Sequence, residues 1–214
     1  MARTRRADYT KSNRIRTLLL SDPEQAARAS HELLKARDAL SRRLLGSELL
    51  AVLASQTGVA VPELVVPDEH QPHRRSGGRI VYSLQGDYRR RLPSPENPRL
   101  ARGGRSLGRI RVPNRTPARG DTVRPTAFLN TLLHEFCHHH DSEALGLLRS
   151  FHTAGFYARL RHLRDQIEAG AGDGLLEPDG ARPARPAAGA RPAPRDAGSP
   201  LPLFDRLWSI IRRL

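Results

Sequence analysis

The segment His134-Glu135-Phe136-Cys137-His138 contains two imidazoles and a carboxylate, side chains of the kinds that could bind and use a divalent metal ion. Residues four apart lie on one face of an α-helix, so the two imidazoles can direct ring nitrogens at one ion. Glu135 is rotated by about 100° from His134, so it can reach a metal-bound water without taking a ligand position. The pattern predicts a zinc site for peptide hydrolysis, with Glu135 as general base.

A catalytic zinc needs a third protein ligand, which the same helix cannot easily provide. Asp141 falls near the correct face but about two turns along the helix, so we interpret it as a carboxylate that orients a histidine or as a polar last-turn residue. The chain must turn at Gly146 and return, and the next metal-competent residue is His152. The alternatives are His162 and Glu143.

The neighbours of the two histidines are interpreted as packing or surface residues. His139 and His140 point away from the pair, and a run of histidines is more often a hydrated surface or a core edge than a ligand set. Cys137 lies on the opposite side of the helix and is predicted to pack in the core. It is the only cysteine, which excludes a disulfide and a four-cysteine zinc site and fits a reducing cytoplasm.

Two predicted helices hold the candidate ligands in an α+β fold. Pro125 opens a strong amphipathic helix that contains the metal motif and ends at Gly146. A second helix is expected over about 152–169, where apolar residues recur every three or four positions. Together they place the HExxH segment inside one helix and His152 at the start of the next.

The preceding half of the domain is predicted to hold an N-terminal helical region and then a small sheet. The helical region covers about 23–56, with a break expected near Gly46 and with Leu33, Leu40 and Leu44 on one packing face. Short β-branched segments bounded by Pro or Gly predict strands at 64–66, 79–84 and 109–112. The Pro- and Gly-rich stretch 93–104 is predicted to be an exposed loop.

Both ends of the chain are predicted to lie outside the core. Residues 1–20 read as a basic disordered arm, because a charged segment without an apolar period cannot bury a face. Residues 170–200 are mostly Gly, Ala, Pro, Arg and Asp, which predicts a disordered linker. Residues 201–214 are an apolar anchor or helix. This leaves 21–169 as a single domain.

The charge and the apolar content indicate the compartment and one class of partner. The net charge is +14, from 36 basic and 22 acidic residues, which suits a negatively charged partner such as nucleic acid. No apolar stretch has the length of a signal peptide or of a membrane span, so we expect a cytoplasmic protein with no membrane partner.

The motif resembles that of the SprT-like zinc metallopeptidases of bacteria, in which a His-x-x-x-Phe segment supplies the third histidine. Here those residues are His134-Glu135-Phe136-Cys137-His138 and His152-Thr153-Ala154-Gly155-Phe156, and the resemblance covers about 75–165. It implies a zincin-like metalloendopeptidase domain with Zn²⁺ on His134, His138 and His152, Glu135 as base, and a protein or peptide substrate. Association of the wider family with DNA-bound proteins implies DNA contact, here through Arg89-Arg90-Arg91 or the N-terminal arm.

Two further hypotheses concern a partner of the C-terminal segment and a function without catalysis. Leu201, Leu203 and Phe204 resemble the short peptide with which bacterial repair proteins dock to the sliding clamp, although the leading Gln of that peptide is missing. The alternative function is a non-catalytic zinc-containing module that binds DNA or protein. Glu135 favours catalysis, because a structural zinc site needs no acid beside its ligand.

Overall fold

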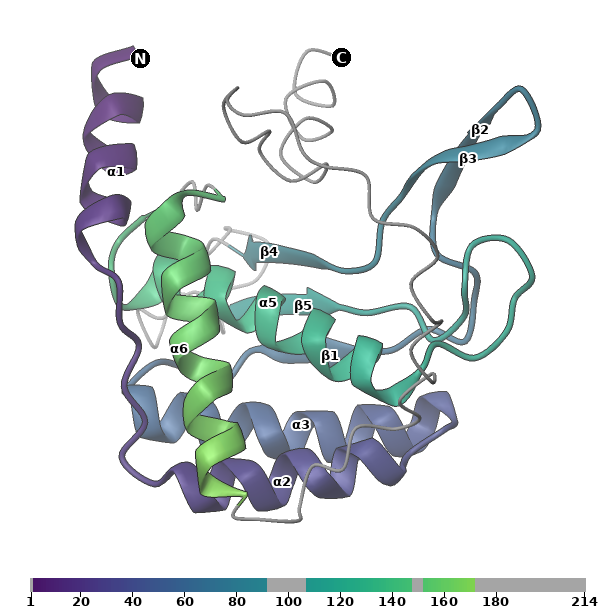
Figure 1. Ribbon diagram of the computed structural model, residues 1–214, viewed down its shortest axis with the longest axis horizontal. Coiled ribbons are helices and arrows are strands. Elements are labelled where there is room, and N and C mark those ends of the chain that lie inside the picture. The colour runs from purple at the N-terminus through teal and green to yellow at the C-terminus, as the bar shows by residue number, and fades with distance from the viewer. Residues whose placement is uncertain (1, 92–106, 148–151, 172–214) are drawn as a thin grey trace, which may run out of the picture. The chain divides into compact units, whose positions relative to one another are not determined.

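The computed structural model describes residues 2–91, 107–147 and 152–171, which form an α+β fold (Figure 1). They belong to one compact unit, Met1–Leu176. The predicted loop at 93–104, the linker from 172 onward and the C-terminal segment 201–214 lie outside the described residues. The described helices are α1 (Ala2–Arg14), α2 (Pro23–Lys35), α3 (Ala39–Thr57), α5 (Pro125–Glu143) and α6 (Ala154–Gly170). The described strands are β1 (Glu63–Val65), β2 (His73–Ser76), β3 (Arg79–Ser83), β4 (Asp87–Arg91) and β5 (Leu107–Arg111).

Three strands form a mixed sheet in the order β1-β5-β4. β1 is parallel to β5 with Leu64 opposite Ile110, and β4 is antiparallel to β5 with Tyr88 opposite the same residue. Ile110 therefore lies on the central strand, and β1 and β4 are the two edges of the described sheet. α5 packs against β4 and β5. Strands β2 and β3 pair separately as a hairpin that projects from the sheet (Figure 1).

The N-terminal helical region is broken earlier than the sequence predicted. Asp22 caps α2 by accepting a hydrogen bond from the Gln25 N–H, and Asp38 caps a new helix, α3, in the same way. The break therefore lies at 36–38, and Gly46 is buried inside α3. The new cap resets the helical phase, so Leu40 and Leu44 are 58% and 55% exposed. Their predicted place on the packing face was wrong.

The first twenty residues are not a disordered arm in the structure. Residues 2–14 form α1, and the segment that follows lies along α6 with Leu18 and Leu20 buried. Gln166 fixes this segment, because its side chain accepts from the Leu20 N–H at 2.9 Å and donates to the Leu18 carbonyl at 2.7 Å. The charge pattern missed the segment because its order comes from hydrogen bonds to α6.

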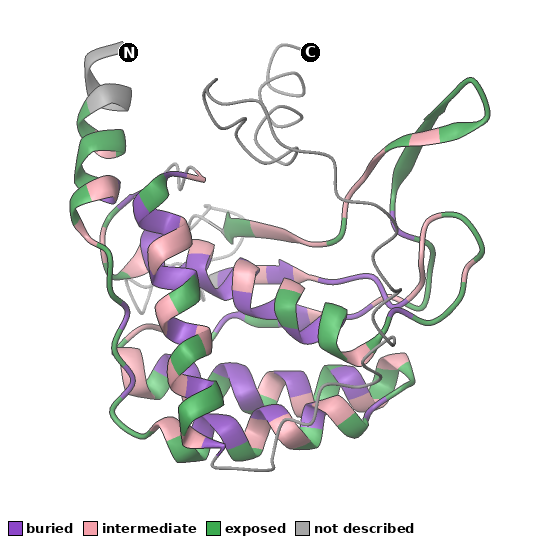
Figure 2. Ribbon diagram, viewed as in Figure 1, coloured by how far each residue is buried: buried purple, intermediate pink, exposed green. Residues whose placement is uncertain are grey.

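A buried arginine ties the start of α5 to the rest of the core. Arg42 of α3 is fully buried and donates to Asn114 Oδ1 at 2.7 Å and to the Val123 carbonyl. Its guanidinium also lies 4.8 Å from the centre of the Phe128 ring on α5. Burial lowers the pKa of Arg42 to about 10. Figure 2 shows buried residues where α5, α6, α2 and α3 face one another.

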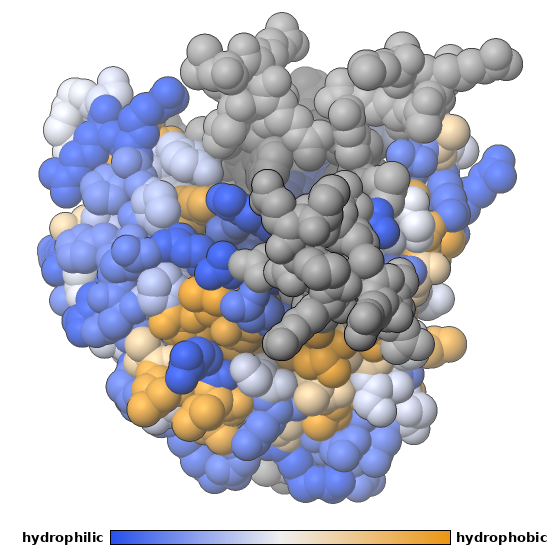
Figure 3. All heavy atoms as spheres, turned by 180° about the vertical axis from the view of Figure 1, so that it is seen from behind, coloured by the Kyte–Doolittle hydropathy of each residue, from blue (hydrophilic) through white to orange (hydrophobic). Residues whose placement is uncertain are grey.

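On the rear face, hydrophobic side chains gather in the lower half of the view, with hydrophilic side chains around them (Figure 3). Leu40 and Leu44 of α3 are among the exposed large hydrophobic residues. Among the described helices, none combines the length and the hydropathy needed to cross a bilayer.

Candidate metal centre

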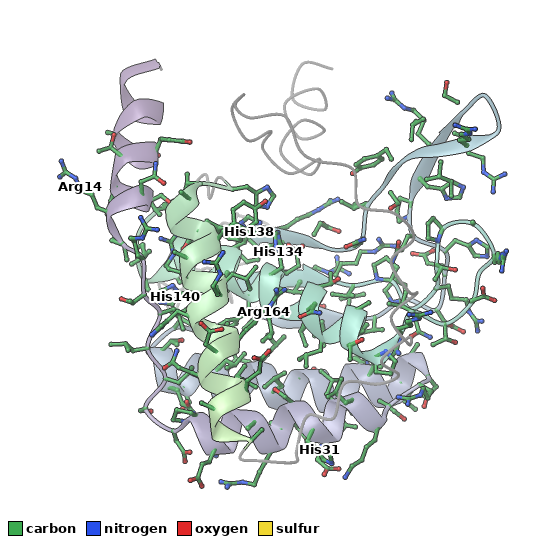
Figure 4. The ribbon with its side chains drawn as sticks, viewed as in Figure 1. Arg14, His31, His134, His138, His140 and Arg164 are labelled. Atoms are coloured by element: carbon green, nitrogen blue, oxygen red, sulfur yellow. The ribbon has the colours of Figure 1, made fainter. Side chains whose placement is uncertain are left out.

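Three imidazoles converge between α5 and the start of α6. His134 and His138 lie one turn apart on the same side of α5 (Figure 4), and His152 directly precedes the N-cap of α6, Thr153. The Nε2 atoms are 3.2 Å apart in the His134–His138 pair. The Nε2 atom of His152 is 2.9 Å from that of His134 and 3.0 Å from that of His138. These three histidines are close enough to bind one metal ion.

The convergence of the three rings fits a cation. Each neutral ring carries at Nε2 either a proton or a lone pair, so at least one of the three contacts would join two protons or two lone pairs. A metal ion removes this conflict by accepting all three lone pairs. Nitrogen ligands of a tetrahedral zinc, with bonds of 2.0–2.1 Å, lie about 3.3 Å apart, close to the spacing here.

The electrostatics around His134 also favour metal binding over protonation of this ring. Burial, together with the neighbouring charges of His152 and Arg164, lowers the pKa of His134 to about 3. A metal ligand must be a neutral imidazole, so a suppressed pKa leaves the lone pair available. The positive charge of Arg164 on α6 therefore lowers the pKa of His134, as burial does.

Phe156 forms an apolar wall against all three histidines. Its ring centre lies 5.1 Å from that of His134, 4.5 Å from that of His138 and 5.2 Å from that of His152. The Tyr157 ring stacks on His152 at 5.8 Å. The Phe side chain is itself fully buried, so it restricts the rotamers of the three imidazoles.

Glu135 is buried beneath the beginning of the edge strand. A Cβ atom at Gly86, which precedes β4, would lie 3.1 Å from Glu135 Oε1 and only 2.7 Å from Thr131 Cγ2. Glycine is therefore needed for this close approach. The pKa of Glu135 is raised to about 8, because burial and the charge of Asp87 raise it by more than the hydrogen bond from the Tyr88 backbone N–H lowers it.

The other residues of the motif that could bind a metal lie outside the group of three histidines. His139 Nε2 donates to the Ala60 carbonyl at 2.6 Å, and its Nδ1 accepts from the Tyr88 hydroxyl at 3.3 Å. His140 is buried, and burial lowers its pKa to about 4. Cys137 is buried in the core, and burial raises the pKa of its thiol. Their predicted exclusion from the ligand set agrees with these positions.

The alternatives for the third ligand lie elsewhere. His162 Nδ1 donates to the Leu18 carbonyl at 2.8 Å. Glu143 lies 3.7 Å from Arg90 of β4 in an ion pair. In the described part of the chain, the group of ligand atoms that could hold a metal contains His134, His138 and His152 only.

Asp141 is an anchor between helices. Its two carboxylate oxygens accept hydrogen bonds from Arg159 of α6 at 2.9 and 2.7 Å, and both side chains are fully buried. The interpretation of Asp141 as a residue that orients a histidine overlooked Arg159. The signal was present in the sequence, because Arg159 lies three residues after Phe156, on the face where α6 places its apolar residues.

No protein-family model, curated protein or solved structure matches this chain. The resemblance to the SprT-like metallopeptidases therefore remains an expectation from the motif residues.

Proposed function

We propose that the chain is a zinc-dependent endopeptidase. The observation that supports this best is the convergence of three histidine Nε2 atoms within 3.2 Å of one another, with Glu135 on the same helix beside the edge of the sheet. Three neutral histidines leave a fourth coordination position open, which is typical of catalytic rather than structural zinc sites.

The residues divide the work as peptide hydrolysis requires. A bound zinc ion would polarise the substrate carbonyl and acidify a water molecule. Glu135 would accept the proton of the attacking water and donate it to the leaving amine. A nearby dication favours the carboxylate form of this buried side chain, which is the form that a base needs. Phe156 excludes water from one side of the three imidazoles.

Strand β4 offers a place for the substrate backbone. It is one of the two edges of the described sheet, and the backbone N–H of Tyr88, near its start, donates a hydrogen bond to Glu135. An extended peptide that pairs with β4 by β-augmentation would pass next to the general base. Such pairing would recognise backbone atoms of the substrate, so the site would accept peptides of many sequences.

Metal content tests the centre directly. We expect mass spectrometry to find about one zinc per native chain and to find it lost from His134→Ala and His152→Ala. His162→Ala is the matched control, because it removes an imidazole from α6 that bonds to the Leu18 carbonyl. Chelation should abolish hydrolysis of an unfolded protein substrate and zinc should restore it. A metal-free native chain, or His152→Ala with native zinc content, contradicts the proposal.

The alternative is a zinc-containing module without catalysis, which binds DNA or protein. It predicts the same zinc content but no hydrolysis of any peptide. Chelator-sensitive hydrolysis by the purified native chain therefore separates the two functions.

For the nucleic-acid partner we propose the β2–β3 hairpin as the contact surface. Arg74, Arg75 and Arg79 are exposed, and no ion pair within the described ranges includes them. Arg89 pairs with Asp87 at 2.7 Å and Arg90 with Glu143, so part of the expected Arg89-Arg90-Arg91 surface is already neutralised. A two-stranded ribbon fits the major groove of duplex DNA.

Salt dependence tests this surface. Replacing Arg74, Arg75 and Arg79 by Gln should make the plot of log affinity against log salt shallower, by about 0.9 per lost phosphate contact. Fluorescence anisotropy with a labelled duplex measures the slope. A control variant that replaces the exposed helical residues Arg28, Arg43 and Arg161 removes the same charge. Equal slopes in the two variants would mean that net charge, and not the hairpin, binds DNA.

A further inference from the structure

The third histidine is not held by a helix in the way that the first two are. His152 precedes α6, and the residue after it, Thr153, is the buried N-cap. The Thr153 hydroxyl accepts from the Phe156 N–H at 3.0 Å and lies 2.7 Å from the Ser12 hydroxyl. The backbone that carries His152 is therefore tied to a segment near the other end of the sequence.

The last turn of α1 closes over the same point of α6. The Asn13 side chain accepts a hydrogen bond from the Gly155 N–H at 3.1 Å, so it satisfies a donor that the first turn of a helix leaves without an intrahelical partner. A Cβ atom at Gly155 would lie 1.9 Å from the Ser12 carbonyl oxygen. Only glycine allows the two backbones to approach this closely. Lys11 adds a bond to the Leu145 carbonyl at 2.5 Å.

Arg159 links this contact to the metal helix. Its guanidinium donates to the Ser12 carbonyl at 2.9 Å and to the Ser12 hydroxyl at 3.1 Å. The same side chain holds Asp141, which lies three residues after His138 on α5. Ser12 is thus hydrogen-bonded both to Thr153, the cap beside His152, and to Arg159. Arg159 in turn binds Asp141 on α5, the helix that carries the other two histidines.

We propose that Ser12 and Asn13 are positioning residues for the metal centre: the N-terminal segment fixes His152 against α5. The inference rests on the proposed zinc site. Neighbouring groups that orient ligands change metal affinity by about 10–100-fold when they are removed. The N-terminal segment would therefore support the metal centre without supplying one of the three ligands.

The double variant Ser12→Ala/Asn13→Ala should lose zinc affinity by about 10–100-fold in a chelator competition assay. Asn13→Asp, which keeps the acceptor oxygen for the Gly155 N–H, should recover affinity relative to Asn13→Ala. The control is Gln166→Ala, which removes two hydrogen bonds between the same segment and α6 far from His152. It should keep native affinity. The visible spectrum of the Co²⁺-loaded double variant should approach that of His152→Ala.

Hydrogen exchange of the chelated protein tests the positioning without metal. The amides of Gly155 and Phe156 should exchange faster in the double variant than in the native chain or in Gln166→Ala. If the double variant exchanges faster but the native chain binds no zinc, the proposed function is refuted and the positioning role is not. Native exchange and native affinity in the double variant, or an equal affinity loss in Gln166→Ala, would overturn the positioning role. If Ser12→Ala does not fold, Asn13→Ala carries the test.

Discussion

Glu135→Gln should lower kcat for peptide hydrolysis by about 10²–10⁴-fold, the usual contribution of general acid–base catalysis, while zinc content stays at the native level. The amide has nearly the shape of the carboxylate but cannot accept the proton of the attacking water. It also introduces no charge into a buried place. Steady-state hydrolysis of an unfolded protein substrate, together with metal analysis of the same sample, measures both quantities.

Glu143→Gln is the matched control for this variant. It removes a carboxylate from the same helix, two turns further on, where its partner is Arg90. Hydrolysis should stay near the native rate. Native activity of Glu135→Gln would refute the role of Glu135, and an inactive native chain with a full zinc site would favour the non-catalytic module.

The centre of the site could be predicted because its geometry is local. The spacing of His134 and His138 fixes their relation on any α-helix, and the structure places both on α5 with Glu135 between them in sequence. His152 was one of three alternatives from spacing alone. The resemblance selected it, and the structure brings it within 3.0 Å of the other two. The spacing of apolar residues along the chain does not show where His152 lies relative to the other two histidines.

The parts that could not be predicted depend on contacts across the chain. The charge of residues 1–20 says nothing about Ser12 and Asn13, whose partners lie more than a hundred residues away. The apolar spacing in α3 gave the wrong face, because Asp38 starts a new helix and turns Leu40 outward. Periodicity assumes an unbroken helix, and a single capping residue invalidates the phase.

The buried charges were missed for a related reason. Arg42 and Arg159 occupy positions that composition assigns to the surface, and both are fully buried. An arginine can be buried when several oxygen acceptors surround its fixed fork of donors. Arg159 has five such acceptor oxygens, and they come from three residues: both carboxylate oxygens of Asp141, the hydroxyl and carbonyl of Ser12, and the carbonyl of Ile15.

Asp141→Ala should lower the free energy of unfolding by about 3–5 kcal/mol, because it leaves the Arg159 charge buried without its counter-charge. Urea unfolding of the chelated protein measures this without a contribution from bound metal. The exposed residue Asp165 of α6 provides the control: Asp165→Ala should stay within about 0.5 kcal/mol of the native chain.

The double variant Asp141→Ala/Arg159→Met separates the lost charge pair from lost packing. Removing both charges takes away the uncompensated guanidinium, so the double variant should be more stable than Asp141→Ala. Recovery should be incomplete, because the Ser12 and Ile15 carbonyls then lose a buried donor. A double variant that is less stable than Asp141→Ala would mean that Arg159 stabilises the fold mainly through these carbonyls, and the N-terminal segment would then depend on it more than α5 does.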